Sequence, residues 1–558
     1  MRRVVVVVGH RADEIVSSLD ALASTLGDFT IRYVTSERYA TTNNVYSLWL
    51  ARDELDEDVY LLDGDVVFDD ELVQALAGRP QDALVPVAPY EPGMTGTVVE
   101  LDRDDWVVQM VDVRDGAPAF GASHKTASVY VLPAAFLREE LVARVDRFVA
   151  EGRVDQFYEG VLSEAVRDGG LRLRAVVCER WREIDDANDW LDAESAFSSP
   201  DERFELVLQS FGGFQRHGAV DHLVMTNIHF PPESMLSDLR RELARSATDY
   251  PVGQATMATL LAGVVEQPPE RIVVGNGASE LIKILAASLT GRALVPVPTY
   301  NEYEGSVPSE QLVRFQLRPP DFRLDVDALD RAVAAAEVEL AVVVSPNNPT
   351  ARAVPRPELI GLCENLGRRG VLLVVDESFV DFCADPSSQS LAEELEAHRN
   401  LAIVKTLSVV CGIPGLRLGY LLSDNLDLRD RLRAKLPVWN VNGVAEAFLR
   451  LLPRYRSLLA ESCSRVRRDC DEFASLLSGI PGVAVAPSSA SFCFVGLPEG
   501  VDGHEVARRL FVEENLLVKD CSGKSMPEGR AYLRIKARTP VENRRLVAAL
   551  ARVLKTRS

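Results

Sequence analysis

No stretch of the sequence is apolar over enough residues to cross a membrane. The β-branched run Val4–Val8 stops at Gly9-His10-Arg11, too early for the hydrophobic region of a secretion signal. The eight cysteines include no Cys-x-x-Cys pair and no Cys/His spacing typical of a metal site, which favours reduced thiols over a disulfide framework. We therefore expect a protein without membrane segments that resides in the cytoplasm.

Positive charge is also scarce. The chain has 61 lysines and arginines against 83 aspartates and glutamates, a formal net charge of −22. Because nucleic-acid binding requires clustered positive potential, this balance argues against a nucleic-acid partner. With 558 residues and no internal repeat, the chain exceeds what one hydrophobic core usually serves, and we expect at least two domains.

Residues 1–195 alternate short apolar runs with amphipathic stretches. This β-α-β rhythm predicts an α/β domain with a largely parallel sheet and helices on both faces, a Rossmann-like arrangement. The polar segment Ser198–Glu202 breaks the pattern, and we expect a linker over residues 196–210. The expected strands are Val4–Val8, Thr30–Val34 and Val59–Leu62, and the expected helices are Ala12–Leu26 and Asn43–Leu55.

A second α/β pattern begins after the linker. Five short β-rich runs with helical stretches between them predict a large domain over residues 211–440. From about residue 440 a helix-rich section leads into further short strands, which predicts a smaller C-terminal subdomain over residues 441–558. The five runs are Arg271–Val274, Ala293–Val297, Leu340–Val344, Val371–Val375 and Leu401–Val404.

Several segments of the second region carry groups that can bind a phosphorylated ring. The segment Gly275–Glu280 follows a strand and opens a helix, so its N–H groups and a serine hydroxyl can bind a phosphate at the positive end of the helix. An arginine in Gly415–Tyr420 offers a second phosphate ligand. The phosphate-binding candidates are Ala278, Ser279, Glu280 and Arg417.

Other side chains can hold the ring and a substrate. Tyr300 can stack on a flat ring, the Asn348 amide can donate to a phenolate, and Asp376 can keep a ring nitrogen protonated. Arg538 can bind a substrate carboxylate. Each residue alone has a plainer explanation, since Asp376 can be a strand-end cap and Arg417 a surface ion pair. The prediction is specific only because all of these residues occur together in one chain.

In this order, from Gly275 to Arg538, the segments resemble the class I/II aminotransferases of pyridoxal phosphate (PLP) fold type I. The resemblance covers about residues 210–555, and its subgroup is histidinol-phosphate aminotransferase and threonine-phosphate decarboxylase. The segments Asp376–Phe379, Ile413–Arg417 and Lys519–Ser522 are more similar to the decarboxylase. The resemblance implies PLP as cofactor and a homodimer with sites at its interface. It also implies roles for Ser408 at the cofactor, for Lys519 at the substrate, and for Tyr250 at the partner's cofactor phosphate.

One position departs from the family pattern. The lysine that binds PLP covalently precedes Gly-Leu-Arg at a fixed distance, and the ungapped alignment of residues 405–417 puts Val409 in its place. Valine has no amine to bind an aldehyde and cannot carry a proton, so a large loss of rate is expected. We therefore expect this half to bind PLP or pyridoxamine phosphate weakly or not at all and to turn over poorly. The alternatives are rescue by another lysine, such as Lys524 or Lys405, or an error in the sequence.

Two acidic segments mark the first 195 residues. Asp63-Gly64-Asp65 follows an apolar strand-like run, and Glu183–Asp186 follows a later one. Carboxylates at the carboxyl ends of strands are placed to bind Mg²⁺ with a nucleoside triphosphate, and two of them on one metal suit nucleotidyl transfer. The alternative is that Asp65 and Asp185 only cap turns.

Together with Val4–His10 and Asn43–Leu48, these segments are similar to the sugar-phosphate and choline-phosphate cytidylyltransferases. The resemblance implies Asp65 and Asp185 as Mg²⁺ ligands, and Asn44 and Ser47 beside the nucleotide of CTP. The family's first strand and Gly-rich triphosphate loop have no counterpart after Met1. We expect either a start codon assigned too far downstream or a remnant of this half.

The fusion of these two halves resembles bifunctional proteins of phosphonate pathways. It implies a transferase that joins a CTP-dependent nucleotidyltransferase to a PLP-dependent aminotransferase or decarboxylase acting on a small amino phosphonate or phosphate ester. The alternative is a non-catalytic or half-active protein that keeps both folds and binds such ligands as a scaffold or regulator. Val409 and the missing Gly-rich loop favour the alternative. The enzyme is favoured by the intact residues Asp376, Asn348, Arg417, Asp65 and Asp185.

Overall fold

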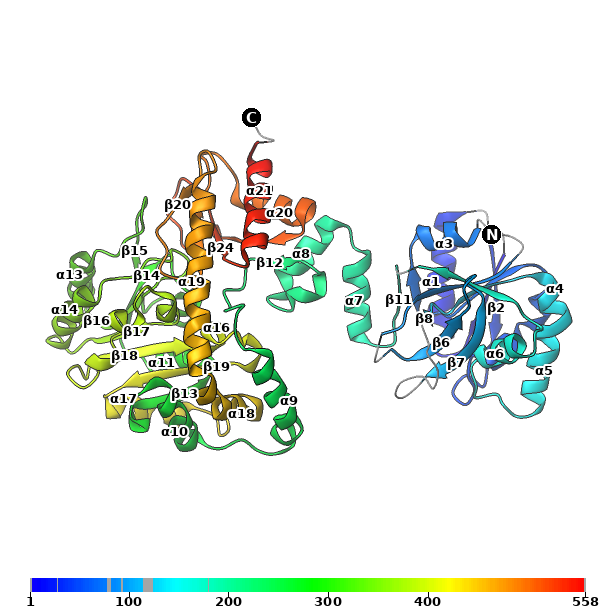
Figure 1. Ribbon diagram of the computed structural model, residues 1–558, viewed down its shortest axis with the longest axis horizontal. Coiled ribbons are helices and arrows are strands. Elements are labelled where there is room, and N and C mark those ends of the chain that lie inside the picture. Colours follow the sequence, from blue (N-terminus) through cyan, green and yellow to red (C-terminus); the bar gives the residue numbers. More distant parts are fainter. Residues whose placement is uncertain are drawn as a thin grey trace. The chain divides into compact units, whose positions relative to one another are not determined.

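The computed structural model describes residues 3–27, 29–77, 82–91, 94–113, 124–178 and 180–555. The chain forms two compact units, Met1–Ser199 and Pro200–Ser558 (Figure 1). No helix in these described ranges is both long enough and apolar enough to cross a membrane.

The first unit is α/β. Strands β1 (Arg3–Val8) and β2 (Thr30–Thr35) pair in parallel. Helix α1 (Ala12–Leu26) connects them in the sequence. A second sheet of seven strands has the order β3-β9-β5-β8-β6-β7, with β10 also paired to β5. Its strands are β3 (Val59–Leu62), β5 (Ala83–Pro89), β6 (Gly96–Leu101), β7 (Val107–Val113), β8 (His124–Thr126), β9 (Val129–Leu132) and β10 (Leu173–Val177).

Strand direction in this unit differs from the expected parallel sheet. Only β1–β2 and β5–β10 pair in parallel, and the other described pairs of the large sheet are antiparallel. Strands β6 and β7 follow each other with a short connection, which allows only antiparallel pairing. The rhythm of apolar runs therefore predicted the elements better than their directions.

Helices α2 (Asn44–Leu50), α5 (Val142–Ala150) and α6 (Glu159–Arg167) share one apolar cluster with residues from one face of the large sheet. In α6, Val161, Leu162 and Ala165 are fully buried, a spacing that places them on one helical face. They contact a core that includes Val85 and Tyr130. This packing fixes the start of α6 beside the acidic turn after β3.

The second unit contains a seven-stranded sheet in the order β13-β19-β18-β17-β16-β14-β15 (Figure 1). All pairs are parallel except those of β19. The five expected runs all form strands of this sheet. The strands are β13 (Ile272–Asn276), β14 (Arg292–Val297), β15 (Leu312–Gln316), β16 (Val338–Val344), β17 (Leu372–Asp376), β18 (Leu401–Thr406) and β19 (Leu418–Ser423).

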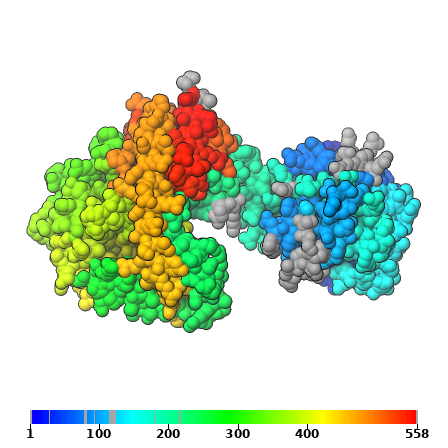
Figure 2. All heavy atoms as spheres, in the orientation of Figure 1, coloured from blue at the N-terminus to red at the C-terminus, as the bar shows by residue number. Residues whose placement is uncertain are grey.

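The C-terminal part of this unit has a sheet and core of its own. Strands β20 (Ala484–Val485), β21 (Phe492–Gly496), β24 (Tyr532–Lys536) and β23 (Lys519–Asp520) pair in this order. Helices α19 (Arg456–Ser478), α20 (Gly503–Glu514) and α21 (Pro540–Lys555) enclose a separate apolar cluster. Figure 2 shows α19 in orange and α21 in red along the surface of the unit.

Most of the expected linker over residues 196–210 is helical. Helix α8 (Pro200–Ser210) buries Phe204 and Val207, three residues apart on one face, in the C-terminal cluster. Arg508 of α20 binds Asp201 at the start of α8. The segment is therefore part of the second unit, and its polar residues belong to the exposed side of an amphipathic helix.

Candidate active sites

The phosphate-binding loop forms where β13 leads into α11 (Ala278–Ala286). Gly277 has φ +78°, and a Cβ there would lie 2.6 Å from Nη2 of Arg417, so only glycine lets the arginine approach. The Ser279 hydroxyl lies 3.3 Å from the Tyr300 hydroxyl. The structure thus brings together Ser279, Tyr300 and Arg417, three of the expected cofactor ligands, at a helix N-terminus suited to a phosphate.

Ala278 and Glu280 can bind a phosphate only through their backbone N–H groups, because the Glu280 side chain is already hydrogen-bonded within the loop. The Glu280 carboxylate accepts hydrogen bonds from the Asn276 N–H (2.7 Å) and the Asn440 amide (2.7 Å). Its side chain therefore braces the loop, and only the N–H groups of Ala278 and Glu280 are available for an anion.

Asp376 ends β17 and is 2% exposed. One carboxylate oxygen accepts from the Tyr303 hydroxyl (2.9 Å) and the other from the Ser378 N–H (2.9 Å). Burial raises the pKa of Asp376 against the lowering effect of these hydrogen bonds and of the Lys405 charge. A protonated ring nitrogen would supply the cation that this buried carboxylate lacks. Tyr303 was not predicted from the sequence.

Asn348, the expected donor to the cofactor phenolate, contacts Arg534, whereas Arg538 was expected to bind the substrate carboxylate. Arg534 of β24, 6% exposed, donates to the Asn348 side-chain oxygen at 2.9 Å. Arg538 instead binds Glu542 at 2.7 Å and the Asp221 carbonyl at 3.1 Å, at the start of α21. Arg538 lies beyond the end of β24, whereas Arg534 is held by the strand. The structure therefore places Arg534 where Arg538 was expected.

Two lysines lie near Arg534. Lys519 of β23 is directly opposite Arg534 in the antiparallel pair, so both side chains share one face of the sheet. Lys524 is 8% exposed, and its amine donates to the Thr299 carbonyl (2.9 Å) and the Asn301 side chain (2.6 Å), on either side of Tyr300. Burial and then the Arg534 charge lower the pKa of Lys524 to about 7.

In the part of the chain that the structure describes, none of these three cations forms an ion pair with a carboxylate. The described ion pairs of this unit involve other lysines and arginines. Of the three, Lys524 and Arg534 are buried. Buried cations without a carboxylate partner are typical of an anion-binding pocket, because an incoming anion compensates their charge. The arrangement can bind a substrate carboxylate and a phosphate or phosphonate.

Val409 lies on the short helix α16 (Leu407–Val410) and is partly buried against the core. Its neighbour Ser408 turns its hydroxyl toward the backbone of Leu418, at 3.4 Å from the N–H. Lys405 forms an ion pair with Asp381 at 3.0 Å. Burial lowers the pKa of Lys405, but the charges of Asp381 and Glu377 outweigh it and raise the pKa overall. Lys405 therefore stays protonated, which leaves its amine unreactive.

Tyr250 is 79% exposed and stacks on Trp439 with ring centroids 4.2 Å apart. It borders a surface cavity of about 200 Å³ that is lined by charged residues including Glu242, Arg245 and Arg450. Tyr250 is not among the residues that the structure brings together around Ser279, Tyr300 and Arg417 in its own chain. The expectation that it reaches a partner subunit stays a prediction.

In the first unit, the two acidic segments converge. Strand β11 (Trp181–Glu183) pairs antiparallel with β4 (Val66–Phe68), and the Ile184 N–H donates to the Asp65 carbonyl at 2.9 Å. Burial and then the Asp185 charge raise the pKa of Asp65. The described residues contain no group of three or more His, Cys, Asp or Glu placed for a metal ion. Two carboxylates fit the Mg²⁺ sites in which substrate phosphates and water complete the shell.

Asn44 and Ser47 lie one turn apart on α2. The Asn44 amide nitrogen donates to Asp63 at 3.3 Å, and its oxygen accepts from the Tyr158 N–H at 2.8 Å. Asn44 thus ties three segments together beside the acidic turn. Among the described residues, Ser47 has no side-chain hydrogen bond that assigns it a role.

The comparisons with known proteins place this chain in a family. The profile of "Aminotransferase class I and II" matches residues 229–550, and the chain belongs to that family. The chain is 40% identical to the CMP-5'-(3-aminopropyl)phosphonate synthase of Streptomyces rubellomurinus, over 99% of this chain and 88% of that protein. It is 29% identical to the L-serine phosphate decarboxylase of Sulfurospirillum multivorans, over 58% of this chain and 86% of that protein.

Solved structures agree with this assignment. A decarboxylase from Sulfurospirillum multivorans superposes with a TM-score of 0.55 at 27% identity, covering 63% of this chain and 99% of that one. The histidinol-phosphate aminotransferase of Sinorhizobium meliloti, solved with pyridoxal 5'-phosphate, has a TM-score of 0.55 at 20% identity over 64% of this chain and 98% of that one. The second unit thus has the PLP fold type I architecture.

Proposed function

We propose that this protein acts on a small amino phosphonate or phosphate ester, binding it with PLP in the second unit and linking it to CMP in the first. One observation carries the proposal for the second unit: Asp376 and Arg417 both lie close to Tyr300. Lys524 and Arg534 lie beside the same tyrosine, with Lys519 opposite Arg534 in the sheet. Likeness to the phosphonate synthase and the phosphoserine decarboxylase supports the substrate class.

The residues present fit the noncovalent part of a PLP site. Ser279, the N–H groups of α11 and Arg417 would hold the phosphate, and Asp376 would hold the ring nitrogen. When bound, PLP supplies an electron-withdrawing ring that stabilises negative charge on the substrate Cα. Arg534 would orient the substrate carboxylate, while Asn348 fixes the guanidinium. Val409 supplies no amine and moves no proton.

The missing amine favours a second candidate, a protein that binds these ligands without turning them over. Lysine labelling separates the two. We expect PLP followed by borohydride to leave Lys405 unmodified, since its ion pair with Asp381 keeps it protonated. An adduct at Lys524 in peptide mass spectra would support a substitute amine. Absence of an adduct on every lysine would support the ligand-binding candidate.

For the first unit we propose CTP and Mg²⁺, with Asp65 and Asp185 as the protein's metal ligands, and for the whole chain a homodimer in which Tyr250 reaches the partner. The support is the convergence of the two acids from distant segments and the match to the CMP-phosphonate synthase over nearly the whole chain.

The variant Asp65→Asn is expected to lower Mg²⁺-dependent CMP transfer at least about a hundredfold, because one of two anionic ligands is lost. Release of pyrophosphate from CTP in the presence of (3-aminopropyl)phosphonate measures this. Asp69→Asn, which removes an acid paired with Arg180, is the control and should keep wild-type transfer. Equal rates in all three proteins would contradict the metal assignment.

Lys524→Met is expected to weaken binding of L-serine phosphate about tenfold, since a hydrogen bond to a charged group is worth about 1.5–3 kcal/mol. The pKa of Lys524 lies near 7, so its charged form grows as the pH falls from 8.5 to 6.5. Wild-type affinity should therefore rise on acidification, and the variant should lose most of this dependence. Titration calorimetry at both pH values tests the prediction, and an unchanged pH dependence would contradict it.

A further inference from the structure

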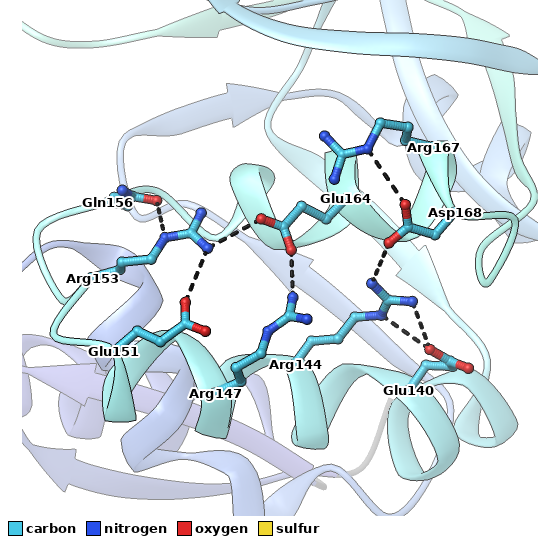
Figure 3. Close-up of polar contacts among 9 residues, drawn as sticks. All are labelled: Glu140, Arg144, Arg147, Glu151, Arg153, Gln156, Glu164, Arg167 and Asp168. Atoms are coloured by element: carbon cyan, nitrogen blue, oxygen red, sulfur yellow. Dashed lines mark hydrogen bonds and ion pairs between the residues drawn. The ribbon is translucent and has the colours of Figure 1, made fainter.

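Glu159, the first residue of α6, is a buried carboxylate with an unsatisfied oxygen. It is 6% exposed, and its Oε2 atom has no hydrogen-bond partner among the described residues. Glu164 on the same helix differs, because it binds Arg147 and Arg153, the latter at 3.1 Å (Figure 3). The four arginines drawn in Figure 3 all pair with other carboxylates, whereas Glu159 is one of the buried residues of α6.

The surroundings of Glu159 are acidic and aromatic. The buried rings of Tyr130 and Tyr158 meet edge to face with centroids 5.9 Å apart. Asn44 links the segment to Asp63. The charged groups that face Glu159 are Asp63, from the turn after β3, and Asp112, from β7. Burial, then the Asp63 charge, raise the pKa of Glu159 to about 8, with Asn44 acting in the opposite direction.

A cation is the ligand that this cluster lacks. Two carboxylates offer acceptors to an ammonium group, and tyrosine rings add attraction for a cation close to their faces. Asp63 is only two residues from Asp65, so their Cα atoms are at most about 7 Å apart.

We propose that Glu159, Asp63, Tyr130 and Tyr158 bind the ammonium group of the amino phosphonate, whose phosphonate then points toward Asp65 and Asp185. This inference rests on the proposed function of the first unit and specifies its substrate: a phosphonate with a primary amine at the end of a short chain. It also gives a reason for burying a carboxyl group whose Oε2 atom has no hydrogen-bond partner among the described residues.

Glu159→Gln tests the proposal without disturbing the fold, since glutamine has the shape of the protonated carboxyl that is present near pH 7. Binding of (3-aminopropyl)phosphonate and of propylphosphonate, which lacks the amine, is measured by calorimetry on the full chain without CTP. The wild type should prefer the amine at least about tenfold, and Glu159→Gln should lose this preference. Binding at the second unit is the same in both proteins and cancels in the comparison.

Glu164→Gln is the matched control on the same helix and should keep the preference, because its charge lies in the outer ion-pair network. A second readout is the number of protons released when the ligand binds. Near pH 7 the Glu159 carboxyl is mostly protonated, so capture of an ammonium should release close to one proton, seen as a buffer-dependent heat that is absent in Glu159→Gln.

Two outcomes separate this inference from the function on which it rests. If both phosphonates bind the wild type equally and Glu159→Gln changes nothing, the ammonium site is wrong and the proposed phosphonate function stands. If neither phosphonate binds the wild type, the proposed function itself is contradicted.

Discussion

Replacing Val409 by lysine is expected to give a protein that retains PLP covalently. Val409 lies on α16, directly after Ser408, and is partly exposed. The helix follows β18, and Arg417 comes eight residues later in the chain. An amine there would meet the aldehyde of a ring held between Asp376 and Arg417. We expect the variant Val409→Lys to keep PLP through dialysis and to gain at least about a thousandfold in turnover of L-serine phosphate, because both the covalent and the proton-transfer group return.

Absorbance of the dialysed protein and peptide mass spectra after borohydride check this result. Val409→Met, which adds a side chain of similar reach without an amine, is the control and should behave as the wild type. If Val409→Lys folds but carries no adduct at position 409, the alignment that places Val409 at the covalent position is contradicted.

Asp376→Asn is expected to weaken PLP binding about tenfold to a hundredfold. The asparagine keeps the shape of the side chain beside Tyr303 and Ser378 but removes the charge that would hold a protonated ring nitrogen. Fluorescence titration with PLP measures the change. Asp330→Asn, which removes a surface partner of Arg369, should leave the affinity unchanged. Equal affinities of wild type and Asp376→Asn would contradict the role of this carboxylate.

The same variant carries a stability prediction. Burial raises the pKa of Asp376 in the folded chain above its ordinary value of 3.8. The wild type therefore loses stability as the pH rises from about that value through the folded pKa, where a buried charge has to form without a direct ion-pair partner among the described residues. Asp376→Asn should not lose it, so its unfolding temperature without cofactor should exceed that of the wild type at pH 7. A lower temperature for the variant would contradict the account of an uncompensated charge.

The sequence predicted the second unit closely because its strands are long apolar runs that end at chemically distinctive residues. Asp376 closes β17 and Gly277 permits Arg417, features that residue type and order already indicate. Arg538 was the exception. Two arginines four residues apart look alike in sequence, and only the end of β24 shows that Arg534 reaches Asn348.

Other features depend on packing that a linear pattern does not contain. Lys524 sits in a loop with no periodicity, and only the fold brings its amine to Thr299 and Asn301. Glu159 looks like an ordinary first-turn acid of a helix until its burial close to Tyr130 and Tyr158 is seen. In the first unit the apolar runs located the strands, but their directions depend on connections whose geometry the spacing alone does not fix.

Titration of the wild-type chain with pyridoxamine phosphate tests the central claim most directly, because this ligand has the ring and phosphate of PLP but no aldehyde. The account predicts saturable binding of one molecule per chain, fully reversible on dialysis, and weakened by Asp376→Asn and by Arg417→Met. Absence of saturable binding, or binding that neither variant alters, would contradict a ring held between Asp376 and Arg417.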